Sequence, residues 1–222
     1  MEKSIKIILS FLLIFILLII VLLFALYFGL ARYICLRFKK TSEKYIQNYR
    51  NIVNHNYDGK VIISLKGDTE SINKLRPTIN SLLDQTIKVN QIFLILEGTD
   101  ELGYDIPDYL RDVVNIIPGS KDYGEGNKIV PILLKEKECD TVIIALDNNV
   151  IYGKDFIQIM LNEMYKNPKT VLIDSNNTCL LLKPSYFGCE ILDRNKDNYD
   201  IDWFRENSKN FMVINYTENY RF

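Results

Sequence analysis

Polar residues that directly follow apolar runs are the candidates for chemistry in this sequence. Three such clusters occur: Ser64 to Thr69, Asp122 to Lys128, and Asp147-Asn148-Asn149. If the apolar runs are strands of an open α/β sheet, the clusters lie beyond the carboxyl ends of the strands, where such sheets bind ligands. We therefore expect a ligand site built from these strand ends.

Several common site types are excluded by the residues present. Gly124-Glu125-Gly126 is not a dinucleotide fingerprint, because the third glycine is missing and no strand immediately precedes it. No phosphate-binding P-loop occurs either. His55 is the only histidine and falls in a polar segment, which removes mechanisms that need a Ser/His or Cys/His pair.

The elements that would position these clusters alternate along the chain. Short apolar runs bounded by turn residues predict strands. These strands are expected at 61–65, 91–96, 113–117, 141–146, 170–173, 178–182 and 211–215. Segments with helical spacing between them predict helices at 72–83, 106–112, 128–138, 154–166 and 200–208. The alternation predicts an α/β fold with a mostly parallel sheet flanked by helices.

An apolar run from Ile7 to Ala31 contains no side chain that is charged at neutral pH. A helix over this run reaches about 37 Å and exceeds the roughly 30 Å hydrocarbon core of a bilayer, so it predicts one transmembrane anchor. A cleaved signal peptide is the alternative, with Lys3 and Lys6 as its basic region. The run is longer than the about 7 to 15 apolar residues of a typical signal peptide, which favours a signal-anchor.

The chain is therefore expected to have three parts: an anchor with a basic collar at 1–40, a stalk or surface helix at 41–57, and one domain at 58–222. The collar consists of basic residues that follow the apolar run: Arg32, Arg37, Lys39, Lys40 and Lys44. By the positive-inside rule the domain faces the cytoplasm. Sequons at Asn176 and Asn215 would indicate the opposite side, but such tripeptides arise readily in an Asn-rich sequence.

The composition limits the classes of partner that are expected and the kinds of cross-link. The formal net charge of −1 gives no long-range positive field, so nucleic acid is not expected as a partner. The 4 cysteines include no CxxC pair and do not form a disulfide framework.

Four motifs in order resemble nucleotide-sugar-dependent glycosyltransferases of the family-2-like kind, which have the GT-A fold. Ser81-Leu82-Leu83-Asp84-Gln85-Thr86 matches "SLLNQT", and the loop Gly124 to Lys128 matches "GxxTK". Asp147-Asn148-Asn149 stands where these relatives have "DDD", so the DXD motif is degenerate, and Asp200-Ile201-Asp202-Trp203 matches a distal "DDxW". The resemblance covers residues 60–215 and implies a GT-A-like glycosyltransferase domain.

The resemblance implies a nucleotide-sugar donor, a glycan, lipid or protein acceptor, and Mn²⁺ or Mg²⁺ at the diphosphate. Asp147 would contact the donor and, with Asn149, the metal. An amide oxygen is a weaker ligand than a carboxylate, so metal affinity should be reduced or lost. Lys128 would contact phosphate, with an ordinary solvated lysine as the alternative. Ser64 and Asn127 belong to the clusters expected around the donor.

The distal element would supply the base that takes a proton from the acceptor hydroxyl. Asp202 is preferred over Asp200, because Asp202 directly precedes Trp203, whose ring could stack on a sugar. In the alternative interpretation Asp200 is a helix N-cap and Trp203 a core residue. Two functions follow: a membrane-anchored glycosyltransferase, or a catalytically inactive glycosyltransferase-like binding or scaffold module at the membrane.

Overall fold

The structure is a computed structural model of the full chain. It describes residues 2–27, 29–38, 42–68, 70–97, 106–119, 122–187, 199–216 and 220–221. Lys39 and Lys40 of the predicted collar, and Thr69 of the first polar cluster, lie outside these residues.

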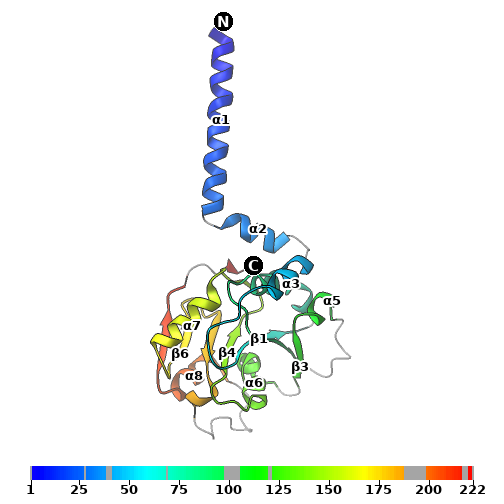
Figure 1. Cartoon of the computed structure of the whole chain (residues 1–222), viewed down its shortest axis with the longest axis vertical. Helices are drawn as coiled ribbons and strands as arrows, with labels where there is room; N and C mark the ends of the chain where they lie inside the picture. The colour runs from blue at the N-terminus through cyan, green and yellow to red at the C-terminus, as the bar shows by residue number, and fades with distance from the viewer. Residues whose placement is uncertain are drawn as a thin grey trace. The chain divides into compact units, whose positions relative to one another are not determined.

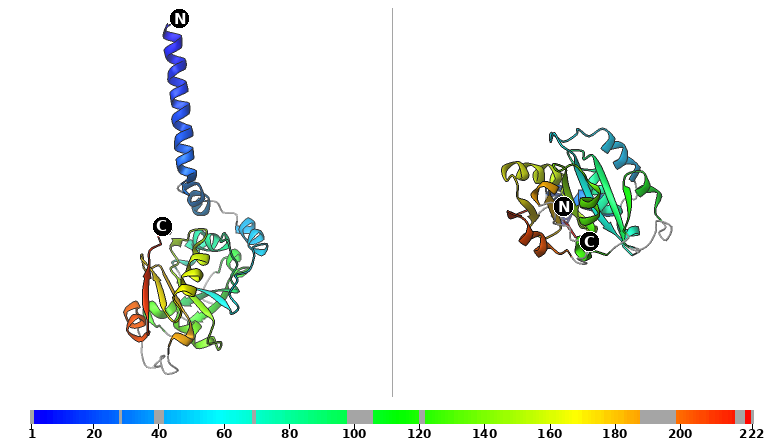
Figure 2. Two further views of the ribbon diagram at one scale, coloured as in Figure 1. Left: turned by 60° about the vertical axis from the view of Figure 1, so that its left-hand side comes forward. Right: turned by 90° about the horizontal axis from the view of Figure 1, so that it is seen from below.

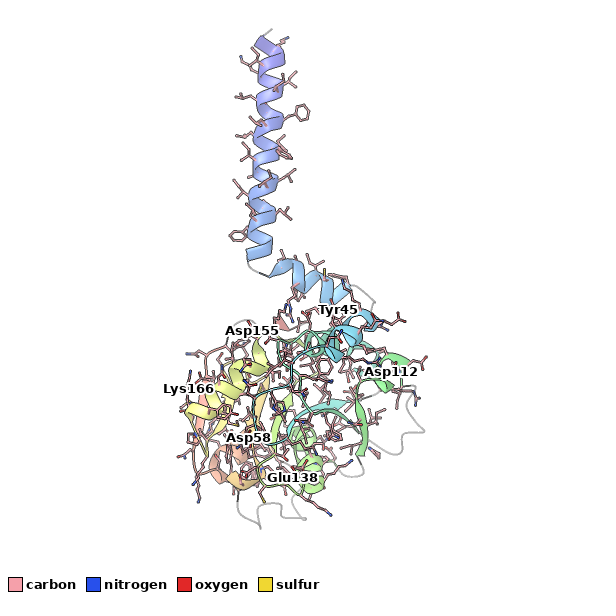
Figure 3. The ribbon with its side chains drawn as sticks, in the orientation of Figure 1. Tyr45, Asp58, Asp112, Glu138, Asp155 and Lys166 are labelled. Atoms are coloured by element: carbon pink, nitrogen blue, oxygen red, sulfur yellow. The ribbon has the colours of Figure 1, made fainter. Side chains whose placement is uncertain are left out.

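The chain forms two compact units, Met1–Lys40 and Thr41–Phe222. The first contains the helices α1 (Glu2–Tyr27) and α2 (Leu30–Phe38), separated at Gly29, which has a φ of +69°. Within α1, Ile5–Phe24 has a mean hydropathy of 3.6 and apolar side chains that project on all sides without cover (Figure 3). This helix is long and apolar enough to cross a membrane, a test that a signal sequence also meets.

The second unit is built on a sheet in the order β3-β2-β1-β4-β7-β6-β8 (Figure 1). Its strands are β1 (Val61–Gly67), β2 (Gln91–Glu97), β3 (Asn115–Gly119), β4 (Val142–Leu146), β6 (Val171–Asp174), β7 (Cys179–Leu182) and β8 (Phe211–Ile214). β7 is antiparallel to β4 and β6, and the other ladders are parallel. The predicted α/β class and mostly parallel sheet are confirmed, with β3 and the red β8 as the edges (Figure 2).

Helices precede, connect and cover these strands. They are α3 (Ser42–Arg50), α4 (Arg76–Leu83), α5 (Asp108–Arg111), α6 (Val130–Lys135), α7 (Phe156–Lys166) and α8 (Ile201–Asn207). Three short 3-10 helices, η1 (Ile72–Lys74), η3 (Gly124–Lys128) and η4 (Pro184–Tyr186), and a two-stranded sheet of β5 (Val150–Ile151) and β9 (Tyr220–Arg221) complete the described elements. The predicted helix at 128–138 is shorter than expected: the chain first makes η3, and α6 then starts with Pro131 in its first turn, where a missing N–H is tolerated.

The core lies on both faces of the sheet, because successive side chains of a strand point to opposite faces. Val61, Ile63 and Leu65 of β1 belong to the cluster that α4 and α7 cover, whereas Ile62 belongs to the cluster that α6 and α8 cover. Each such side chain contributes about 1.5–3 kcal/mol on full burial. Two covered faces hold the strand ends in fixed positions.

Residues 41–57 include a surface helix that packs on the domain. Tyr45, Ile46 and Tyr49 of α3 pack against the core cluster (Tyr45 is labelled in Figure 3). The Tyr49 hydroxyl donates to the Val89 carbonyl at 3.3 Å and accepts from the Val89 N–H at 3.1 Å. Burial raises the pKa of Tyr49 to about 12. Of the two expectations for this segment, the structure shows the surface helix, because its aromatic side chains find apolar cover.

Candidate functional site

A cleft lies at the carboxyl ends of β1 and β4, and we call it the strand-end cleft. Its volume is about 460 Å³. The lining residues are Lys66, Asp68, Glu125, Lys128, Leu146, Asp147, Asn148, Asn149, Asn177 and Ile201. Members of all three polar clusters therefore meet in one cleft, as expected when parallel strands end at the same edge.

An ion pair joins the second and third clusters across the cleft. Lys128 Nζ lies 2.6 Å from Asp147 Oδ1. Only 14% of the Lys128 side chain and 26% of the Asp147 side chain are exposed. Because the pair is partly shielded from water, its electrostatic attraction exceeds that of a fully exposed pair.

The backbone at Asp147 is held firmly in place. Its N–H lies 2.9 Å from the Thr178 carbonyl and 2.9 Å from the Tyr152 hydroxyl oxygen, which accepts. That hydroxyl lies 2.9 Å from the Thr178 carbonyl and 3.1 Å from the Asp147 carbonyl, either of which can accept its proton. Tyr152 is fully buried, and burial raises its pKa well above the ordinary value. A neutral phenol thus fixes the end of β4 against β7.

Asn148 ties two strand ends together. Its side-chain Nδ2 donates to the Lys66 main-chain carbonyl at 2.9 Å, and the main-chain carbonyl of Asn148 accepts from Thr78 Oγ1 at 2.8 Å. An ionised carboxylate has no proton to donate at this position. The amide therefore has a structural role that aspartate could not fill.

The predicted Mn²⁺ or Mg²⁺ site stays a prediction, and its donor set is poor. Asp147 supplies a carboxylate, but Lys128 already contacts it. Asn149 is exposed and supplies only a neutral oxygen. Across the part of the chain that the structure describes, no group of three His, Cys, Asp or Glu side chains is placed to hold a metal ion. These residues do not fit a resident divalent cation.

Asn127 and Ser64 lie behind the cleft and do not line it. Asn127 Nδ2 donates to Glu97 Oε1 at 2.6 Å and to Asp122 Oδ1 at 2.9 Å, while its Oδ1 accepts from the Tyr123 N–H at 2.7 Å. Its side chain thus organises the loop before η3. Ser64 is fully buried, and its Oγ has no hydrogen-bond partner among the described residues.

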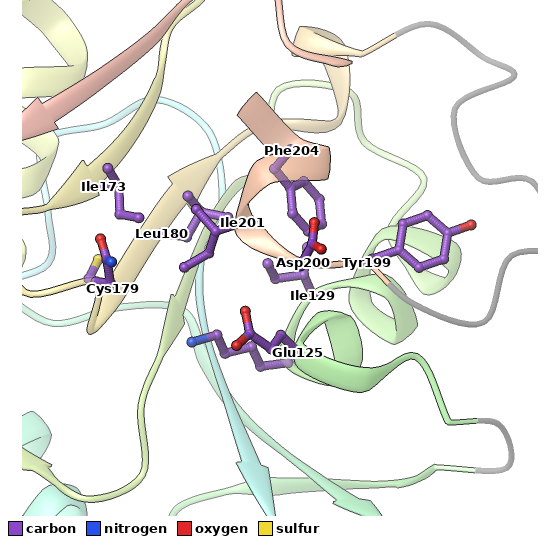
Figure 4. Close-up of a pocket in the computed structure, with 11 residues that line it drawn as sticks. Glu125, Ile129, Ile173, Cys179, Leu180, Tyr199, Asp200, Ile201 and Phe204 are labelled. Atoms are coloured by element: carbon purple, nitrogen blue, oxygen red, sulfur yellow. The ribbon is translucent and has the colours of Figure 1, made fainter. Parts of the chain in front are cut away.

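A narrow pocket extends the cleft toward α8. It has a volume of about 10 Å³ and shares Glu125, Lys128, Asn177 and Ile201 with the strand-end cleft. Figure 4 shows Glu125 from η3 on one side and Asp200, at the start of α8, on the other. The first residues of α8 therefore belong to the same site as Asp147.

The two aspartates of the distal acidic element lie in different surroundings: Asp200 lines this pocket, and Asp202 is exposed to solvent. Asp200 is the N-cap of α8, and its Oδ1 accepts from the Trp203 N–H at 2.8 Å. Asp202 pairs with Arg205 at 2.6 Å, its side chain is 72% exposed, and it lines neither cavity. Trp203 packs edge-on against Tyr199, with ring centroids 4.6 Å apart. The structure thus has the N-cap and packing arrangement, because the capping bond fixes which face of α8 turns inward.

The sequence alone does not assign an individual role to some of the lining residues. Lys66 and Asp68 stand in the first polar cluster, which was the available signal. Asn177 comes from the turn between β6 and β7 and has a φ of +57°, a conformation that asparagine tolerates better than most residues. No sequence pattern directed it to the cleft, because its position depends on the antiparallel direction of β7.

Comparisons with known proteins identify a fold. No protein-family model and no curated protein sequence matches the chain. Two solved structures of HddC from Yersinia pseudotuberculosis are similar over 73% of this chain and 92% of theirs, at 13% sequence identity. The TM-scores are 0.51 for HddC complexed with GMP-PN and 0.50 for the other structure. At this identity the likeness shows the α/β fold alone.

Proposed function

We propose that the strand-end cleft binds a nucleoside-diphosphate sugar and that the chain is a membrane-anchored glycosyltransferase. One observation carries the proposal: three polar clusters meet at the carboxyl ends of β1 and β4 and bring Lys66 and Lys128 into one cleft. Ammonium groups attract phosphate oxygens. The α/β fold of HddC, solved with GMP-PN, supports a nucleotide as the ligand.

Asp200 is the base that the geometry favours. It lines the pocket that adjoins the cleft, whereas Asp202 points to solvent and pairs with Arg205. In a direct displacement Asp200 accepts the acceptor's hydroxyl proton as the acceptor oxygen bonds to the anomeric carbon. The bond from that carbon to the diphosphate oxygen breaks, and the diphosphate leaves with the electron pair. Lys128 and Lys66 stabilise the charge that develops on it.

In this proposal the acceptor is a glycan, a lipid or a protein, and α1 would hold the domain at a membrane. The helix at Ile5–Phe24 would anchor the domain beside acceptors at the bilayer surface. The excess of basic residues after it supports a domain that faces the cytoplasm.

A matched pair of aspartate variants tests the base. The full chain is assayed with radiolabelled nucleotide sugars for hydrolysis and for transfer to membrane extracts. Asp200→Asn keeps a good N-cap and should lower turnover by about 100-fold or more without weakening donor binding. Asp202→Asn, two residues away, should leave turnover within about twofold, since its exposed ion pair contributes little. Equal activity in Asp200→Asn and the parent chain would contradict the assignment.

The second candidate is a catalytically inactive binding or scaffold module. The observation that favours it is Asn148, whose amide serves as a strand tie where the resembling enzymes carry an acidic residue. A chain that binds nucleoside diphosphates but neither hydrolyses nor transfers any sugar nucleotide would establish this module.

A further inference from the structure

We infer that Lys128, and not a divalent cation, holds the donor diphosphate, and that Asp147 competes with the donor for Lys128. The inference rests on the proposed function, because it names how the same cleft recognises its ligand. It changes the role of Asp147 from a metal ligand to an internal competitor.

The Lys128 ammonium occupies the position that a metal ion would need. It lies 2.6 Å from Asp147 Oδ1, which is where a cation bound by this carboxylate would sit. A divalent ion entering there meets a positive charge at contact distance, and the two repel each other. Only 14% of the Lys128 side chain is exposed, so the side chain is packed within the cleft and does not extend into solvent.

The described residues at the tip of β4 offer few other ligands for a metal ion. Asn148 uses its amide to tie β4 to β1, and Asn149 is an exposed amide. Asp68, on the other wall, accepts through Oδ1 from the Glu70 N–H at 2.9 Å and the Ser71 N–H at 2.7 Å. Among the described residues, this strand end directs no second carboxylate to Asp147, so a divalent cation there would depend on the diphosphate for most of its ligands.

The cleft that would bind an anionic diphosphate also contains acidic side chains. Lys66 and Lys128 face three carboxylates, those of Asp68, Glu125 and Asp147. An ammonium has three N–H donors, so Lys66 can keep its 2.5 Å contact with Glu97 and still donate to phosphate. Lys128 has the same capacity, but Asp147 beside it repels the phosphate. Removal of this one charge should therefore strengthen diphosphate binding.

The test is calorimetric titration of the full chain in detergent micelles with UDP, GDP, ADP, CDP and dTDP, in EDTA and in MnCl₂. At least one diphosphate should bind with an affinity that differs by less than about threefold between the two buffers. Asp147→Asn should tighten this binding by about three- to tenfold in EDTA, because the competing charge is gone while the shape is kept. Metal coordination predicts instead that the parent chain binds only in MnCl₂ and that Asp147→Asn loses this binding.

Lys128→Gln should weaken the same binding by about tenfold or more. Lys60→Gln is the matched control, since Lys60 makes a comparable 2.8 Å ion pair with Glu136 outside the cleft. The affinity of this variant for the diphosphate should stay unchanged. A thermal unfolding curve for each variant separates lost contacts from a lost fold.

Two results would overturn the inference. Binding that requires MnCl₂ and disappears in Asp147→Asn contradicts it while leaving the proposed function intact. Absence of binding for all five diphosphates in both buffers contradicts the proposed function and the inference together.

Discussion

At the scale of single residues, the site depends on Tyr152, whose phenol is fully buried and does not line the strand-end cleft. Tyr152 places one hydroxyl between the backbone of Asp147 and the Thr178 carbonyl. The fixed position of the Asp147 carboxylate follows from this bond and not from its own side-chain contacts alone. A small change in the core should therefore reach the cleft.

Tyr152→Phe should lower the free energy of unfolding by about 1–3 kcal/mol, because it leaves buried backbone groups with fewer partners. Urea denaturation measures the change. Tyr165→Phe is the control, since Tyr165 is exposed and its hydroxyl lies 3.5 Å from the Asn56 carbonyl, so its effect should be near zero. Equal losses in the two variants would contradict this role of Tyr152.

Asp122 should make stability depend on acid pH. The Gly124 N–H and then the Asn127 side chain hold the pKa of Asp122 below its ordinary value. A lowered pKa in the folded state stabilises the fold above about pH 4, and this contribution is lost as the pH falls through the folded pKa. Asp122→Asn should therefore make the unfolding free energy less steep below about pH 4. Glu206→Gln on α8 controls for the loss of one charge, and identical slopes for both variants would refute the assignment.

At the scale of elements, η3 and α8 must approach closely for the pocket to exist. A Cβ added at Gly126 would lie 2.6 Å from Tyr199 Cβ and 3.0 Å from the Tyr199 carbonyl oxygen. Backbone cannot give way as a side-chain tip can. Glycine at this position therefore sets the spacing between the cleft and the start of α8.

Gly126→Ala should destabilise the fold by about 1–3 kcal/mol and move the segment that begins at Tyr199. Trp203, the only tryptophan, packs on Tyr199, so its fluorescence reports the movement. Gly67→Ala is the matched control, because its added carbon meets the flexible end of Leu94 at 3.0 Å. A larger effect of Gly67→Ala on stability and fluorescence would contradict this account.

The elements also show what the sequence could predict. The apolar runs of β1 and β4 identified two buried strands, and parallel pairing then brings their polar ends together. The Lys128–Asp147 pair was not predictable, because Lys128 lies in a short 3-10 helix rather than in the predicted α-helix. The orientation of Asp202 was not predictable either. It depends on which aspartate caps α8, and an aspartate at either position suits a helix N-cap.

At the scale of the whole molecule, two units with different surfaces share one chain. The unit Met1–Lys40 exposes a continuous apolar helix, while the unit Thr41–Phe222 buries its apolar side chains in two core clusters. Apolar area of this extent on α1 requires lipid or detergent for solubility.

Deletion of residues 2–40 should convert a membrane-bound protein into a soluble one. The full chain should remain with membranes after an alkaline carbonate wash, and the shortened chain should appear in the supernatant with cooperative thermal unfolding. Terminal sequencing of the membrane-bound chain distinguishes the alternative: a mature chain that begins after Ala31 would show a cleaved signal peptide and contradict the anchor.

The turn between β6 and β7 offers a place where the specificity of this protein can evolve. Asp174 accepts from the Thr178 N–H at 2.6 Å, the Thr178 hydroxyl at 2.8 Å and the Cys179 N–H at 2.7 Å, so the base of the turn is fixed while Asn177 reaches the cleft. Residues exchanged or inserted at the tip would reshape the ligand cavity without altering the pairing of the strands. Under the proposed function, diversification of this hairpin would be a direct route to variants that accept different sugars.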